Sequence, residues 1–269
     1  MKIQYVLLLI LLLINSLVQA QETEPDRIDS DRPGLGESAK VLPHKRLQIE
    51  IGSNYEFDKL IIGNVVNKYQ NIDFNNTVIR YGLFERVEVR LGFNFSQSIW
   101  RSSSSIASLA GRTPIGFTPW SLGFKAQVSD SKGAVPQIAI EGNLEIPYPA
   151  AAAFKTDYVA TNFIIPFTWT LHESLTMSVN LGAYWNGDSP VPDYFSSFGF
   201  DAALPANLGT FVEAYMFISE DGIFTPGFNA GILWQALPYL QFDFSAGIGL
   251  NKEAPNGFLN GGVSFFILN

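Results

Sequence analysis

The sequence predicts an all-β protein, built as a single closed antiparallel transmembrane β-barrel of about 12 strands, with short periplasmic turns and longer external loops. The first observation is composition. Of the 269 residues, 47% are hydrophobic and 16% are charged, yet beyond the N-terminus no 18-residue stretch is apolar. The second observation is an alternation of apolar and polar residues with a period of two, typical of strands with one apolar face. The third is an alternation of long and short links between these strands.

The N-terminus has the three parts of a secretory signal peptide. Lys2 provides a positive charge, residues 6–14 form an apolar stretch, and residues 18–20 form a small-residue cleavage site. We therefore expect residues 1–20 to be a signal peptide that is removed before Gln21. The alternative is a permanent membrane anchor, but the apolar stretch is short for a hydrocarbon core of about 30 Å.

Residues 21–45 precede the first predicted strand and show no periodicity. Prolines, among them Pro33, prevent regular structure in this stretch. We expect an N-terminal periplasmic or plug segment, in which Asp31 and Arg32 fold back, pair with charges of the barrel interior and narrow its periplasmic mouth. The alternative is a solvated leader without contacts, and either interpretation leaves residues 46–269 for the barrel.

Alternation with a period of two is clearest in four segments, which are residues 47–57, 87–95, 138–146 and 240–248. Noisier segments of the same kind complete the set: 70–81, 120–128, 158–170, 174–185, 196–205, 209–218, 225–235 and 258–268. These strands are longer than the usual 5–6 residues or so of soluble sheets. Their length is what a tilted strand needs to cross a bilayer.

The links between the predicted strands divide into two kinds. The long links are 58–69, 96–119, 147–157, 186–195, 219–224 and 251–257. The short links are 83–86, 129–136, 171–173, 205–208 and 236–239. Because long and short links alternate, all long loops lie at one rim of the barrel and all tight turns at the other, as in outer-membrane barrels.

The five tryptophans fall at the ends of predicted strands, which indicates two aromatic girdles at the membrane interfaces. Trp100, Trp120 and Trp185 are expected at the outer rim, and Trp169 and Trp234 at the periplasmic rim. The alternative is that these rings pack at the ends of a soluble β-sandwich. The length of the strands and their continuous apolar faces favour the girdles.

Charged residues on the polar faces of the strands are expected to point into the lumen, because an arginine facing lipid would cost about 2–4 kcal/mol at the midplane. The predicted lumen network consists of Glu50, Arg80, Glu88, Arg90, Lys125, Glu141, Glu145, Glu213 and Asp243. One interpretation is a charged constriction that selects solutes. The other, which the tight hairpin around Arg80, Glu88 and Arg90 favours, is a buried network of salt bridges that fills a narrow lumen.

The sequence argues against catalysis, cofactors and nucleic-acid binding. It contains no cysteine and two separated histidines, His44 and His172, and it lacks the hydrolase, zincin and P-loop motifs, so we expect no metal site and no cofactor. With 17 Lys and Arg against 25 Asp and Glu, it has no basic face for nucleic acid. The same acidic excess predicts that an open lumen would prefer cations or neutral solutes to anions.

Two motifs give the sequence a family resemblance. DRPGLGES at residues 31–38, followed by LP at 42–43 and the strand that starts at 47, resembles the opening of the outer-membrane transporter family named for the MetA pathway of phenol degradation. IRYGLFERVEVRLG at residues 79–92 is similar to an internal hairpin of that family. The resemblance implies an outer-membrane barrel with a transport function and poorly defined substrates.

These expectations combine into a bacterial outer-membrane channel for passive passage of small molecules, apolar or aromatic ones included. Its partners would be outer-membrane lipid, a small solute and, during biogenesis, the barrel-assembly machinery. The alternative function is a structural or surface-interaction barrel whose lumen is packed and non-conducting. A soluble secreted β-sandwich is a third interpretation, which would need no detergent to stay in solution.

Overall fold

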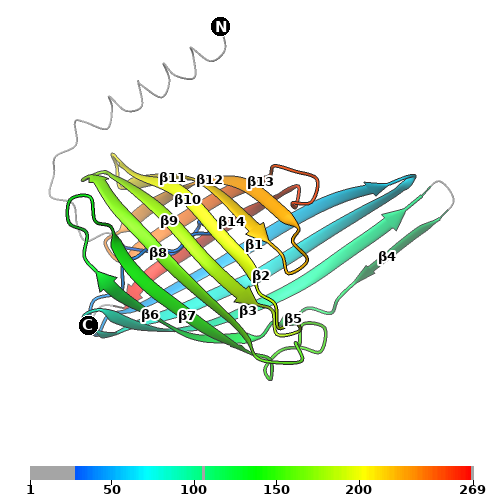
Figure 1. Ribbon diagram of the computed structural model, residues 1–269, viewed down its shortest axis with the longest axis horizontal. Coiled ribbons are helices and arrows are strands. Elements are labelled where there is room, and N and C mark those ends of the chain that lie inside the picture. The colour runs from blue at the N-terminus through cyan, green and yellow to red at the C-terminus, as the bar shows by residue number, and fades with distance from the viewer. Residues whose placement is uncertain (1–27, 105–106, 268–269) are drawn as a thin grey trace, which may run out of the picture.

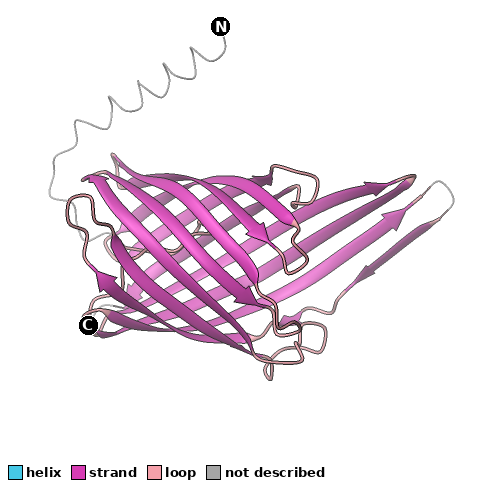
Figure 2. Ribbon diagram, in the orientation of Figure 1, coloured by secondary structure: helices cyan, strands magenta, loops and turns pink. Residues whose placement is uncertain are grey.

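The computed structural model describes residues 28–104 and 107–267, and these residues form one antiparallel sheet of fourteen strands that closes on itself (Figures 1 and 2). The strands are β1 (Leu47–Ile62), β2 (Val65–Phe84), β3 (Val87–Ser103), β4 (Ser108–Arg112), β5 (Gly116–Phe117), β6 (Trp120–Ser129), β7 (Gln137–Ile146), β8 (Ala160–His172), β9 (Leu175–Trp185), β10 (Asp193–Leu204), β11 (Leu208–Ile218), β12 (Phe224–Leu237), β13 (Leu240–Gly249) and β14 (Gly257–Ile267). The predicted signal peptide, residues 1–20, lies outside the described residues.

The sheet closes because its strands pair with one another around a complete ring. β1 pairs with β14 from Leu47↔Ile267 to Phe57↔Gly257, and it also pairs with β2, which in turn pairs with β3. β3 then pairs with β6, and each later strand pairs with the next as far as β14. Of the fourteen strands, only β4 and β5 lie off this ring, so twelve strands form the barrel wall and the predicted barrel is confirmed.

The wall has its apolar residues outside and its polar residues inside. Side chains such as Leu122, Phe163 and Ile248 are exposed on the outer face, whereas the largest fully buried side chains include Arg80 and Lys125. This is the reverse of a soluble protein, and lipid is the solvent that it fits. Within the described residues, no helix has the length and apolarity that crossing a membrane would require.

Two of the predicted external loops are wrong. Residues 58–69 were expected as a loop, but β1 and β2 continue through them and join at a tight turn where Gly63 has a φ of 58°, as such hairpin turns require. The expected loop at 96–119 likewise contains the end of β3 together with β4 and β5. Both faces of these strand extensions lie above the barrel wall. Their residues therefore do not alternate between apolar and polar, and the sequence pattern does not predict them as strands.

The five tryptophans lie at different points along their strands. Trp120 begins β6 and contacts Phe93 at 5.8 Å between ring centroids, and Trp185 ends β9. Trp169 and Trp234 each lie three residues before the end of their strand, towards the periplasmic turns. Trp100 differs, because β3 continues to Ser103 and places this residue within a strand that extends beyond the barrel (Figure 1).

Candidate solute pathway in the barrel lumen

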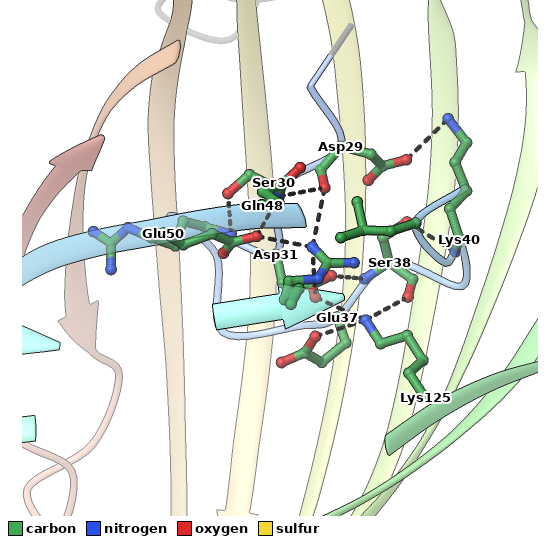
Figure 3. Close-up of polar contacts among 12 residues, drawn as sticks. Asp29, Ser30, Asp31, Glu37, Ser38, Lys40, Gln48, Glu50 and Lys125 are labelled. Atoms are coloured by element: carbon green, nitrogen blue, oxygen red, sulfur yellow. Dashed lines mark hydrogen bonds and ion pairs between the residues drawn. The ribbon is translucent and has the colours of Figure 1, made fainter. Parts of the chain in front are cut away.

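The lumen is crossed by residues 28–45, which we call the N-terminal segment. It has no regular structure (Figure 3), and it starts near the short turns, where Ile28 and Ser174 line the same cavity. An apolar contact fixes its two ends there, because Ile28, Leu42 and Phe266 form a small buried cluster. Between these two ends, residues 31–38 lie across the interior and contact the wall.

The wall contributes a first group of charges from β1, β2 and β3. Arg80 Nε lies 2.8 Å from Glu88 Oε1, and Arg80 Nη1 lies 2.8 Å from Glu50 Oε1. These three side chains are at most 1% exposed. A buried cation without partners would be very costly, so the arginine and the two carboxylates stabilise one another only as a set.

A second group of charges lies one strand further along the wall. Lys125 on β6 stands directly opposite Glu88 on β3 and Glu141 on β7 in the register of the sheet. Arg90 Nη1 reaches Glu141 Oε2 at 2.6 Å, and Lys125 Nζ reaches the same oxygen at 3.3 Å. Both cations therefore share one wall carboxylate and have capacity for further anionic partners.

The N-terminal segment supplies those partners (Figure 3). Asp31 Oδ2 lies 2.8 Å from Arg90 Nη1, 2.8 Å from Lys125 Nζ and 3.1 Å from Arg80 Nη1. Glu37 Oε2 accepts hydrogen bonds from Lys125 Nζ at 2.9 Å and from Arg90 Nη1 at 3.2 Å. Asp31 thus joins the two groups of wall charges into one central ion-pair cluster.

The central cluster has more carboxylates than cations. Its eight members are Asp31, Glu37, Glu50, Glu88 and Glu141 against Arg80, Arg90 and Lys125. Burial raises the pKa of Glu37 to about 8; Arg90 opposes this rise, and the carboxylates of Asp31 and Glu141 add to it. Burial also raises the pKa of Asp31, but Arg80, Lys125 and Arg90 outweigh it and hold that pKa well below its usual range. Burial and the neighbouring carboxylates therefore favour the protonated form of Glu37.

Contacts outside the central cluster hold the rest of the segment. Arg32 Nη2 donates to Asp243 Oδ1 at 3.2 Å and to Asn260 Oδ1 at 2.6 Å. Glu213 accepts hydrogen bonds from two backbone N–H groups of the segment, those of Leu35 at 2.9 Å and Gly36 at 2.7 Å. Further wall side chains accept from its backbone: Asn180 from Glu37, Thr168 from Ala39 and Glu88 from Leu42.

The predicted lumen residues thus divide by position. Six of them meet in the central cluster, and these are Glu50, Arg80, Glu88, Arg90, Lys125 and Glu141. Glu213 on β11 and Asp243 on β13 instead bind the segment outside that cluster, and Glu145 forms no ion pair within the described part of the chain. Pro33 contributes its carbonyl oxygen, which accepts from Ser245 Oγ at 3.2 Å.

Sequence reasoning missed Glu37 and Asn180 as partners within the lumen. In the sequence, Glu37 is one of several charges in a stretch without periodicity. No sequence pattern predicts which wall residue it contacts. Asn180 lies on the polar face of β9, so its inward position follows from alternation. Its backbone partner, the N–H of Glu37, depends on how the segment folds back and leaves no sequence signal.

Asp31, Glu37 and Glu141 also bring carboxylate oxygens within 4.8 Å of one another, a spacing that could surround a metal ion. Arg90 and Lys125 already lie against these same oxygens at 2.6–3.3 Å. A divalent cation there would stand beside two positive side chains, so the donor set fits an ion-pair cluster better than a metal site.

Two cavities lie on the two sides of the N-terminal segment. The periplasmic cavity has a volume of about 270 Å³ and includes Asp201 and Gln241 from the strand ends near the short turns. The outer cavity has a volume of about 530 Å³ and includes Asn54 and Tyr215 from the opposite halves of the strands. Both are lined by residues 31–34 and 37, so the segment borders each of them.

Aromatic rings line one side of the outer cavity. Tyr215 lies 6.2 Å from Phe217 and 6.4 Å from Phe258 between ring centroids, and Phe217 lies 4.9 Å from Phe195. The other side carries acids and amides of β1 and β2, such as Asp73, which accepts hydrogen bonds from Asn94 and Ser96. A passing solute would therefore meet an aromatic surface on one side and hydrogen-bonding groups on the other.

A closed antiparallel barrel with an even number of strands, an apolar outer face and a charged interior is the architecture of outer-membrane β-barrel proteins. The chain belongs to one family of this class, described as "Putative MetA-pathway of phenol degradation", whose profile matches residues 30–267. The family resemblance seen in the sequence motifs is thereby confirmed. No curated protein sequence matches the chain.

Solved structures show the same fold at low sequence identity. The COG4313 outer membrane channel from Pseudomonas putida F1 has a TM-score of 0.61 and 13% identity, covering 87% of this chain and 99% of its own. The translocator domain of autotransporter NalP from Neisseria meningitidis has a TM-score of 0.52 and 10% identity, covering 82% of this chain and 88% of its own. The structural resemblance is thus to outer-membrane barrels of bacteria with two membranes.

Proposed function

We propose that the protein is an outer-membrane channel through which small solutes pass passively, and that the N-terminal segment narrows its lumen. Asp31, Arg32 and Pro33 would act as the plug, and the lumen charges would hold it in place. Residues 1–20 would direct the chain to the outer membrane of a Gram-negative-type bacterium and then be removed, and the barrel-assembly machinery would insert the barrel.

The observation that carries this proposal is the pair of cavities on the two sides of one segment. A barrel with a purely structural role could pack its interior throughout, whereas here space remains on both sides of a single irregular segment. Residues 31–38 of this segment can shift without breaking any hydrogen bond of the sheet, because their contacts run from their backbone and charges to wall side chains.

The lining of the outer cavity supports a class of solute. Tyr215, Phe217 and Phe258 offer ring faces to apolar or aromatic groups, while Glu56 and Asp73 face the same space with negative charge. Small neutral or cationic solutes with an apolar or aromatic part would therefore be accepted, and anions would be disfavoured. The structurally similar protein from Pseudomonas putida is itself an outer membrane channel, which supports a channel role.

The second candidate function is a non-conducting barrel that contacts partners through its external strands. The buried ion-pair cluster around Arg80 favours it, because buried networks of this kind also fill a lumen and specify a fold. Liposome swelling distinguishes the two functions: permeation by small neutral solutes supports the channel, and a complete lack of permeation supports the closed barrel.

Deletion of residues 21–40 tests the role of the N-terminal segment. If this segment narrows the pathway, the deleted protein should show a larger single-channel conductance in planar bilayers than the mature protein, because the segment that borders both cavities is gone. Heat-modifiable migration in electrophoresis provides the control for a folded barrel. Unchanged conductance of the folded, deleted protein would defeat the plug.

A further inference from the structure

The ends of β1, β2 and β3, together with β4, extend beyond the rest of the barrel as a projecting sheet (Figure 1). The pairing of β1 with β14 stops at Phe57↔Gly257, whereas β1 and β2 remain paired to Ile62↔Val65. β3 follows β2 to Val66↔Ser103 and then receives β4. Because this rim carries the long links, the projecting sheet stands on the external side of the membrane.

One face of the projecting sheet carries four cations. Lys59 stands directly opposite Lys68, which stands directly opposite Arg101, in the register of β1, β2 and β3. Arg112 on β4 pairs with Ile99, two residues before Arg101 on β3, so it lies on the same face. All four side chains are exposed, and the acid nearest in sequence, Asp58, points to the opposite face.

Nothing within residues 28–104 and 107–267 neutralises these cations, because none of the four forms an ion pair there. Directly opposed side chains on neighbouring strands have their Cβ atoms about 4.5–5.5 Å apart, and like charges in such pairs are destabilising. Lys59, Lys68 and Arg101 form two such pairs in succession. An arrangement that costs stability in isolation is relieved when an anion binds across it.

The orientation of this face identifies the anion. Lys59 has the same parity along β1 as Ile49 and Ile51 on the outer wall, whereas Gln48 and Glu50 point into the lumen. The cationic face is therefore the upward continuation of the lipid-facing wall and stands above its apolar band. In an outer membrane, the groups at that height are the phosphorylated sugars of the glycolipid in the outer leaflet.

We infer that Lys59, Lys68, Arg101 and Arg112 form a binding surface for the phosphate groups of the outer-leaflet glycolipid. The two guanidinium groups can each bind a phosphate with two parallel hydrogen bonds, and the two ammonium groups add positive charge between them. Binding at this surface does not require an open lumen, so this inference is independent of the proposed channel function.

The test compares the full mature chain in detergent with a variant that carries K59Q, K68Q, R101Q and R112Q. Binding of bis-phosphorylated lipid A is measured by titration with native mass spectrometry. Each cation near an anionic lipid surface strengthens binding about fivefold, so the variant should bind at least tenfold more weakly. Wild type should show a similar loss when the lipid A has been dephosphorylated.

A matched variant, R86Q with K132Q, removes cations from the short turns at the opposite rim and should bind as wild type does. Heat-modifiable migration confirms that each variant is folded. Binding of the fourfold variant within twofold of wild type would overturn the inference, as would equal binding of dephosphorylated lipid A. Inorganic phosphate that displaces lipid A at equimolar concentration would assign the surface to a free anion and overturn the lipid as its partner.

Discussion

At the scale of single residues, this protein buries what soluble proteins expose. Arg80, Lys125 and Glu141 are among its largest fully buried side chains. Each is tolerable only because oppositely charged groups lie within hydrogen-bonding distance, since an unpaired charge removed from water is costly. The charges of this cluster are not balanced, because five carboxyl groups share three cations, and burial favours a proton on one of the five.

That carboxyl group is Glu37, which predicts a pH dependence of the closed pathway. In the free segment its pKa would lie near 4.5, and burial in the lumen raises it to about 8. Since the docked state binds the proton more tightly, docking is most favourable below pH 4.5 and weakens as the pH rises towards and through about 8. Single-channel conductance should therefore increase on going from acidic to alkaline solution.

Glu37→Gln provides the control for this prediction, because glutamine imitates the protonated carboxyl group but does not titrate. The variant should keep the low conductance of the acidic wild-type channel as the pH rises. The groups that face Glu37 are Asp31, Glu141, Arg90 and Lys125, and their charges are retained. A wild-type conductance that falls with rising pH, or a variant with the same pH profile as wild type, would contradict this assignment.

At the scale of elements, the N-terminal segment is held largely through its backbone. The N–H groups of Leu35, Gly36, Glu37, Ala39 and Leu42 all donate to side chains of the wall. The wall therefore binds the backbone of the segment. The segment can approach wall side chains most closely at a glycine, which has no side chain of its own. Gly36 is such a place, because a Cβ atom there would lie 2.5 Å from Asn180 Nδ2 and 2.6 Å from Glu213 Oε1.

Gly36→Ala should consequently loosen the segment. Crowding of this kind costs about 1–3 kcal/mol, and the hydrogen bond from Gly36 N to Glu213 would be strained with it. We expect a larger mean single-channel conductance than in wild type. Gly34→Ala is the matched control, because a Cβ atom there has its nearest neighbour, Glu213 Oε2, at 3.6 Å. Equal conductance of the two variants would show that this contact does not hold the segment.

The elements differ in how far the sequence predicts them. Within the membrane, alternation with a period of two predicts all twelve wall strands, because one face of each meets lipid and the other meets the lumen. Beyond the membrane this contrast disappears, which is why the outer parts of β1, β2 and β3 were expected as loops. A register shift between Asp73 and Asn75 likewise leaves the alternation of β2 ambiguous near Thr77.

The candidate site is predictable to a similar extent. Alternation places Glu50 and Glu88 on the inner face, and the cost of an arginine facing lipid places Arg80 there too. The tight β2–β3 hairpin then brings Arg80 close to Glu88. Alternation cannot say that Asp31 will join these charges to Lys125, because residues 94 positions apart meet only through the path of an irregular segment. Long-range contacts of this kind depend on the closed barrel as a whole.

At the scale of the whole molecule, the outer surface divides into a band for lipid and a projecting sheet for the aqueous exterior. Exposed apolar residues cover the wall, among them Phe198 on β10, Ile232 on β12 and Phe244 on β13. The projecting sheet also exposes isoleucines, but there they accompany the four cations described above. Exposure alone therefore does not distinguish the two regions; their positions relative to the barrel do.

Two isoleucines provide a test of this division. Ile232 in the middle of β12 and Ile61 near the tip of β1 are each 58% exposed and both point outward. Ile232→Arg should lower the free energy of unfolding in phospholipid vesicles by about 2–4 kcal/mol, since it places a charge in hydrocarbon. Ile61→Arg should change it by less than about 0.5 kcal/mol, because water reaches that side chain. Equilibrium denaturant titration measures both, and equal effects of the two substitutions would show that the wall around β12 does not face lipid.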